Sequence, residues 1–390
     1  MADAAGGGSG PAGRAADGTA AAAFRAFLDG LAEVAAGTAG VGVDATCGQE
    51  SAEGHRHVLH LLSAALDFYL EGDPERPVFT RIVSPARKLL GDNPDAVYHF
   101  APLRGDRAYR IRGRRGDACY LSVTVHAAAA DGRIGGVHER PAADLNHLAL
   151  EEAPGEPFEL VLSPEPLDPQ PARFVRLAPE AVSVIVRHYF ETEAPVAADP
   201  SRAFELSIQA LHPPGPAAPW SEAALAERLA RALAFVRGAT LEMPQLPEGG
   251  FISRTPNVLG QPLVFRQAGE AGWGAVDIAY SMGPYRVAPD EALLVEGRFP
   301  ECLFANVVLW NRFMQTFDYR ERPVSRNRAQ TRLEPDGSFR MVIAHRDPGV
   351  PNWLDTEGHA EGTMFWRFLM PKGEVARPSC RLVPLASLEA

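Results

Sequence analysis

Residues 119–127 read CYLSVTVHA, and this stretch indicates the fold class of the chain. Successive side chains of an extended strand point to opposite faces. Positions 119, 121, 123 and 125 therefore share an apolar face, and the more polar positions between them share the other. This alternation is typical of an antiparallel sheet with one face in the core. It predicts a mainly β protein.

Further alternating runs extend the pattern on both sides of this stretch. Residues 98–103, 108–112 and 158–163 complete a first group of strands separated by short turns. The turn Glu334-Pro335-Asp336-Gly337 is a hairpin signal, because proline suits its second position and glycine closes it. A second group of strands is predicted at residues 275–282, 292–299, 304–310, 329–333, 338–344 and 363–370. Their number and short turns favour sandwiches.

Helical additions are predicted before and between the two groups of strands. Apolar residues recur at helical spacing in residues 24–36, 54–70, 179–190 and 221–238, the last with Ser221 as N-cap and Gly238 at its end. The chain is therefore divided into a disordered tail at 1–22, N-terminal helices with a first β-sandwich unit at 23–175, a helical connector at 176–250 and a C-terminal β unit at 251–390.

Charge, cysteine spacing and hydropathy exclude several classes of protein. With a formal net charge of −11, the chain is a poor match for nucleic acid, so no nucleic-acid partner is expected. Cys47, Cys119, Cys302 and Cys380 form no C-x-x-C pair, which argues against a disulfide framework and a zinc site. No signal peptide or spanning segment is recognisable. We expect a cytoplasmic protein without a membrane partner or cofactor, and homo-oligomerisation is left open.

Several separated motifs of the C-terminal third resemble the family named domain of unknown function 1214. They are NVVLWNR at residues 306–312, the EPDGS turn, and PNWL at residues 351–354 before a strand that ends in Met370-Pro371. The usual NWLPAP continuation is here NWLDTEGH. GDNPDAVY at residues 91–98 resembles a motif of the companion family 1254, with Ala96 where threonine is common. Together these resemblances imply a pair of jelly-roll-like β-sandwiches, a fold that hosts many functions.

The densest group of functional side chains lies in residues 345–359, HRDPGVPNWLDTEGH. Loops on rigid β scaffolds often carry binding residues. The sequence predicts a hydrolase or lyase acting on a small polar or glycosidic metabolite, with carboxylates and histidines as general acid and base. The candidate catalytic residues are Asp355, Asp347, His345, His359 and Asp95. The candidate substrate-binding residues are Arg346, which would clamp a developing negative charge, and Asn352, Trp353, Asn93, Tyr98, Trp310 and Asn311.

Three alternatives accompany this hypothesis. The loop could be a structural plug in which Asn352 and Asp355 satisfy backbone groups and Trp353 fills the mouth of the sandwich. The chain could be a non-catalytic ligand-binding or assembly module. It could also be a cupin-like enzyme with a metal held by His345, Asp347 and His359. Convergence of the candidate carboxylates and histidines on one pocket would favour the enzyme.

Overall fold

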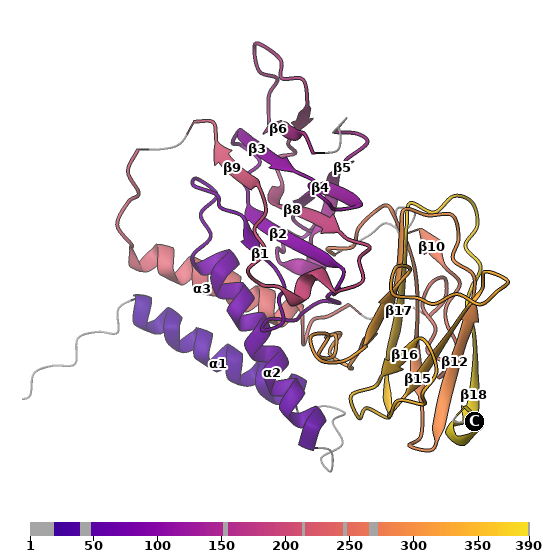
Figure 1. The fold of residues 1–390 in the computed structure, drawn as a ribbon. Coiled ribbons are helices and arrows are strands. Elements are labelled where there is room, and N and C mark those ends of the chain that lie inside the picture. The colour runs from indigo at the N-terminus through magenta and orange to yellow at the C-terminus, as the bar shows by residue number, and fades with distance from the viewer. Residues whose placement is uncertain are drawn as a thin grey trace, which may run out of the picture.

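Four sheets, in which most neighbouring strands are antiparallel, form two β-sandwich units, shown in Figure 1. The computed structural model describes residues 19–39, 48–150, 155–212, 215–244, 248–264 and 272–388. Residues 1–18 of the predicted tail and Cys47 lie outside these ranges. Residues 19–22, which were assigned to the tail, belong to the first helix. The other three cysteines, Cys119, Cys302 and Cys380, are free thiols.

The first unit packs a five-stranded sheet against a four-stranded one. The five-stranded sheet has the order β1-β2-β8-β4-β5, with β1 Thr80–Arg81, β2 Ala96–Pro102, β8 Ala181–Tyr189, β4 Tyr120–Ala127 and β5 Arg140–Asn146. The other has the order β7-β6-β3-β9, with β7 Phe174–Arg176, β6 Pro157–Ser163, β3 Tyr109–Arg114 and β9 Leu206–Ala210. Leu121, Ile111 and Leu160 lie in the core between the sheets.

The second unit repeats this arrangement in the C-terminal part of the chain. Its first sheet has the order β10-β11-β17-β13-β14, with β10 Leu263–Val264, β11 Ile278–Arg286, β17 Glu361–Leu369, β13 Phe304–Trp310 and β14 Ser325–Asn327. Its second sheet has the order β16-β15-β12-β18, with β16 Trp353–Asp355, β15 Phe339–Ala344, β12 Glu291–Gly297 and β18 Ser379–Pro384. The buried Trp366 and Phe339 stack in its core, with ring centroids 5.2 Å apart.

The helices cover the outer face of the five-stranded sheet in the first unit, as Figure 1 shows. They are α1 Thr19–Ala39, α2 Gly48–Ala65 with the π-helical turn η1 Leu66–Leu70, and α3 Glu222–Gly238. Phe68 stacks on Phe100 of β2 at 4.4 Å between ring centroids and meets Phe235 of α3 edge-on. Ser221 caps α3 as predicted, because its hydroxyl oxygen accepts a hydrogen bond from the Ala224 N–H at 3.1 Å.

The mainly β character and the sandwich arrangement agree with the sequence, but three local predictions are wrong. Residues 179–190 form β8 rather than a helix, because this Val- and Ile-rich run lies between β2 and β4 at the centre of a sheet. Residues 120–127 of the stretch 119–127 are buried on both faces, since helices and the second unit cover the face that alternation left to solvent. Residues 329–333 form no regular strand, although the Glu334 turn closes with a Gly337 N–H to Glu334 carbonyl bond of 2.9 Å.

A buried segment, residues 88–95, fastens the first unit to the second and is called here the inter-unit strap. Lys88 donates from Nζ to the carbonyl oxygens of Thr316 and Phe317, both at 2.7 Å. Further along, the Asp92 carbonyl accepts from Nε1 of Trp310 at 3.1 Å. The strap thus anchors the edge of the first sheet to β13 and the chain after it.

Candidate functional site

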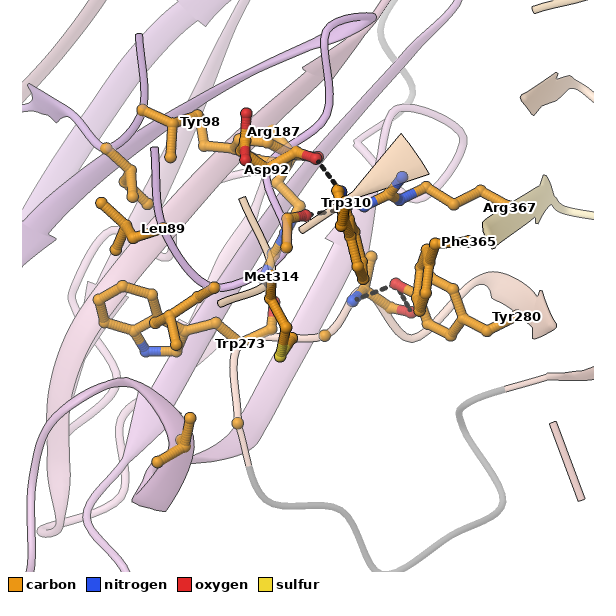
Figure 2. Close-up of a pocket in the computed structure, with 18 of the residues that line it drawn as sticks. Leu89, Asp92, Tyr98, Arg187, Trp273, Tyr280, Trp310, Met314, Phe365 and Arg367 are labelled. Carbon is orange, nitrogen blue, oxygen red and sulfur yellow. Dashed lines mark hydrogen bonds between the residues drawn. The ribbon is translucent and has the colours of Figure 1, made fainter. Parts of the chain in front are cut away.

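A cavity of about 280 Å³ lies between the two units. Figure 2 shows Leu89, Tyr98 and Trp273 on one side of it and Phe365, Tyr280 and Arg367 on the other. The walls come from the strap, β2, β8, residues 272–275 and strands β11, β13 and β17. The cavity is therefore lined by residues of the strap and of both sandwich units.

Aromatic and aliphatic side chains together form the walls. Trp310 stacks on Phe365 with ring centroids 4.2 Å apart and an interplanar angle of 25°. The strap passes against this pair at Gly91, which has a φ of 78°. A Cβ at that position would lie 2.7 Å from the Trp310 ring, so glycine is needed for both the backbone conformation and the close approach. The walls are consequently flat, apolar and tightly packed.

Two arginines supply the positive charge of the cavity. Arg187 on β8 is 2% exposed and donates to the Thr124 hydroxyl at 2.5 Å and the Trp273 carbonyl at 2.9 Å. Arg367 on β17 is 4% exposed and donates from Nη2 to the Gly91 carbonyl at 2.8 Å. Among the described residues, neither guanidinium has a carboxylate within ion-pair distance. Charges buried in this way usually have a partner.

Three tyrosines surround the same space. The Tyr98 hydroxyl lies 3.4 Å from that of Tyr189, and the Tyr280 hydroxyl bonds to the Ala275 backbone. Burial raises the pKa of all three phenols, although the positive charges of Arg367 and Arg187 act in the opposite direction. The hydroxyls are therefore protonated at neutral pH and can act as hydrogen-bond donors.

Glu139 fixes one wall of the cavity from behind. Its carboxylate accepts from Trp273 Nε1 at 2.9 Å, the Ser183 hydroxyl at 2.8 Å and the Gly135 N–H at 3.0 Å. Burial raises the pKa of Glu139, and these hydrogen bonds lower it in part. The contacts hold the indole ring of Trp273 against the cavity. Glu139 is thus a positioning residue for the wall.

The loop predicted as the active site satisfies its polar groups locally. Asn352 accepts from the Arg332 N–H at 2.8 Å and donates to the carbonyls of Arg332 and Arg340 at 2.8 and 2.9 Å. Asp355 accepts from the Glu357 N–H at 2.8 Å and pairs with Arg322 at 2.7 Å. These are the contacts that the plug alternative requires.

The other side chains of this loop also have separate surroundings. His345 bonds to the Val287 carbonyl at 2.9 Å and the Thr356 hydroxyl at 2.9 Å. Asp347 is exposed and accepts from the backbone N–H of residue 349 at 2.8 Å, and Arg346 is exposed beside it. Trp353 is half-buried and donates from Nε1 to the Ala344 carbonyl at 3.1 Å. Neither Asp347 nor Asp355 lines the cavity between the units.

His359 belongs to a contact with α2. Its Nε2 lies 3.0 Å from the Glu53 carboxylate, its ring stacks on Phe317 at 4.5 Å, and Asn311 also donates to Glu53 at 3.0 Å. Burial lowers the pKa of His359, but the hydrogen bond and charge of Glu53 outweigh it and raise the pKa overall. Burial raises the pKa of Glu53, but the hydrogen bond and charge of His359 outweigh it and lower the pKa overall. The resulting ion pair attaches α2 to the second unit.

Asp95 and Asn93 are structural parts of the strap. The Asp95 carboxylate is fully buried and accepts from Nδ2 of Asn306 at 2.8 Å and of Asn327 at 3.0 Å. Asn93 accepts from the same Asn306 amide at 2.7 Å. Burial raises the pKa of Asp95 to about 6, although the two amide donors oppose this shift. The contacts of Asp95 are thus with β13 and β14, which gives its proposed convergence with the 345–359 loop no support.

Of the predicted site residues, only Tyr98 and Trp310 line the cavity. Sequence reasoning missed both arginines, although each interrupts a nearly continuous apolar strand, VSVIVRHYF at 182–190 and TMFWRFLM at 363–370. A single arginine in such a run is a signal of a buried charge with a function. The predicted metal set also fails to meet: in the part of the chain that the structure describes, no three His, Cys, Asp or Glu side chains are grouped to hold a metal ion.

The fold and cavity define a mainly β protein of two sandwich units with a pocket between them. Residues 308–373 match the family described as Protein of unknown function (DUF1214), which confirms the resemblance of the C-terminal third. That match does not reach residues 91–98, so the resemblance to family 1254 stays a prediction. Comparison with curated proteins gives no match. Within the described ranges, no helix is long and apolar enough to cross a membrane.

One solved structure extends the likeness beyond the DUF1214 region. An uncharacterized protein from Burkholderia cenocepacia is 28% identical with a TM-score of 0.78, over 94% of this chain and 97% of that one. The VPA0106 protein from Vibrio parahaemolyticus is 12% identical with a TM-score of 0.49, over 92% of this chain and 100% of its own. The first likeness supports the whole two-unit architecture.

Proposed function

We propose that the chain binds a small, largely apolar molecule in the cavity between its two units. The observation that carries this proposal is a cavity of about 280 Å³ lined by Trp273, Tyr280, Trp310 and Phe365. At roughly 30 Å³ per water, this space equals about nine water molecules. It lies near the lower end of the ~300–1,000 Å³ of ligand pockets, which are mostly apolar with a few polar groups.

This proposal adopts the ligand-binding alternative rather than the acid–base enzyme. A hydrolase or lyase built on residues 345–359 and Asp95 would need those side chains around one substrate, whereas the contacts of Asp355, Asp347 and Asp95 are with Arg322, a backbone N–H and an asparagine amide, which lends the enzyme no support. The cavity instead offers flat rings, tyrosine hydroxyls and guanidinium groups. A jelly-roll topology for the two units, and with it an analogy to other ligand-binding jelly rolls, remains part of the proposal.

Ligand-induced stabilisation tests the proposal. Naphthalene derivatives and medium-chain acids and amides are screened for a rise in the free energy of unfolding. Binding to the folded state alone adds about 2.7 kcal/mol at a probe concentration 100 times Kd. Ala275→Leu extends a side chain into the cavity and should remove the effect, since Ala275 lines it.

Ala223→Leu is the matched control. Ala223 is exposed on α3, so the substitution makes the same chemical change outside the cavity. It should keep the full ligand response. Probes that stabilise the wild type and Ala275→Leu equally would bind elsewhere and would overturn the proposal. A complete absence of binding by every probe class would have the same meaning.

A further inference from the structure

We propose that the ligand of the cavity is a carboxylate on a flat ring system, with its anionic head held by Arg367 and Arg187. This inference rests on the proposed function and specifies the chemical class that the cavity recognises. Its basis is the pairing of two buried guanidinium groups with an aromatic cavity wall.

The first support is the unused hydrogen-bonding capacity of the two arginines. A guanidinium has five N–H donors. Arg367 uses Nη2 for the Gly91 carbonyl, and its buried Nη1 has no hydrogen-bond partner among the described residues. Arg187 is bonded to one hydroxyl and one carbonyl, both uncharged. An anion in the cavity would give these donors a charged acceptor and would strengthen the contact.

The second support comes from the two buried carboxylates of the strap. Asp92, which also lines the cavity, accepts at Oδ1 from the Thr316 N–H at 2.8 Å, while its Oδ2 has no hydrogen-bond partner among the described residues, and Asp95 accepts from two asparagine amides. Burial raises the pKa of both acids. The negative charges of these carboxylates act on Arg367 through space, but their oxygens make no hydrogen bond to its guanidinium. An acceptor from outside the described residues can therefore bind the free guanidinium N–H group.

The third support is the geometry of the ring wall around Arg367. Its guanidinium carbon lies 4.6 Å from the Phe365 ring centroid and 5.3 Å from that of Trp310, and Figure 2 shows the guanidinium against Trp310. Such stacking keeps the guanidinium plane fixed and its edge available. A flat ring can contact the same aromatic wall while its carboxylate reaches that edge of the guanidinium. A flexible alkyl chain could make the same contacts, but it would lose more conformational entropy on binding.

The tyrosine pair provides a further donor for the head group. In the Tyr98–Tyr189 contact only one hydroxyl can donate to the other, and the remaining proton has no acceptor among the described residues. A carboxylate fits this arrangement better than a phosphate ester. Transfer of a dianion from water into an apolar cavity costs more than transfer of a monoanion.

Calorimetric titration of the whole chain with matched probes tests the inference. The probes are 2-naphthoate, its neutral amide, 2-naphthyl phosphate and decanoate. We expect 2-naphthoate to bind at least tenfold more tightly than each of the other three. Arg367→Met, which keeps an apolar stem in the cavity, should weaken 2-naphthoate at least tenfold and change the amide less than threefold. Arg187→Met is expected to do the same.

Arg326→Met is the control, because Arg326 is a half-buried arginine that donates to the Trp353 carbonyl and lies outside the cavity lining. It should leave all four affinities within threefold. Retained binding of the amide shows that each variant is folded. If the wild type binds amide and carboxylate equally, or if neither cavity variant weakens 2-naphthoate, the inference is overturned while the proposed function stands. Tighter binding of the phosphate or decanoate overturns the assigned head group or body. If no probe binds, the proposed function fails as well.

Discussion

The ion pair between Arg328 and Glu191 should be one of the strongest single contacts between the two units. Arg328 donates from Nε to one Glu191 oxygen at 2.6 Å and from Nη2 to the other at 2.5 Å. The same guanidinium also donates to the carbonyls of Cys302 and Leu303, both at 2.9 Å. The bidentate geometry and partial burial, with side chains 30% and 16% exposed, distinguish it from the surface pairs.

The expected magnitude follows from these contacts. A hydrogen bond to a charged group contributes about 1.5–3 kcal/mol, and the fork makes two of them. Partial exposure and the entropy of fixing two long side chains reduce this sum. We therefore expect a coupling of about 2 kcal/mol between Arg328→Met and Glu191→Gln. Arg328→Met alone should cost about 3 kcal/mol, because it also leaves two carbonyls without their donor.

Urea unfolding followed by tryptophan fluorescence measures this coupling as a double-mutant cycle. The matched control is Arg286 with Glu361, an arginine–glutamate pair on neighbouring strands at 2.6 Å, whose side chains are 62% and 60% exposed. Its coupling should stay within about 0.5 kcal/mol. A coupling as small for Arg328 and Glu191 would refute the reasoning that this pair clamps the units around the cavity.

Three further predictions concern the loop and the first sheet. Asn352→Ala should lower the free energy of unfolding by about 2–4 kcal/mol, because it removes three hydrogen bonds to backbone at a residue with a φ of 61°. A decrease of less than ~0.5 kcal/mol, measured by denaturant unfolding, would contradict the plug role. Asp355→Asn should cost about 1 kcal/mol through its pair with Arg322 and leave ligand affinity unchanged by titration; lost affinity at unchanged stability would return Asp355 to the site. Burial lowers the pKa of His99 to about 3 and of His188 to about 4. Below pH ~6.5 the unfolded state therefore binds more protons than the folded state, and the free energy of unfolding falls as the pH drops toward 4. His188→Asn should make this fall less steep in melting curves recorded across that pH range, and an unchanged pH dependence would refute the prediction.

The sequence predicts most elements whose pattern is local. Residues 304–310 match β13 in both bounds, and the cap of α3 and the Glu334 turn also appear where expected. Residues 179–190 were misassigned because a fully buried strand has no polar face, so its apolar run also fits a helix. The Val and Ile content of β8 favours the strand, but only its place between β2 and β4 decides the matter.

The cavity was harder to predict because its walls come from distant parts of the chain. Polar density in residues 345–359 suggested chemistry, but in the structure Asn352 and Asp355 bond to nearby backbone, which their short side chains do readily. Arg187 and Arg367 are 180 residues apart in sequence, the difference between the two numbers, and line the same cavity from different units. No local motif marks such a pair. The GDNPDAVY segment stands out in the sequence for its resemblance to family 1254 and for the carboxylate of Asp95, whereas in the structure it joins the units.

The most direct test of the account is a crystal structure of the chain soaked with 6-bromo-2-naphthoate, with the bromine located by anomalous scattering. The account predicts a bromine peak inside the cavity, with the naphthalene ring near Trp310 and the carboxylate at Arg367 and Arg187. A peak at the 345–359 loop, or on the surface with the cavity empty, would contradict it.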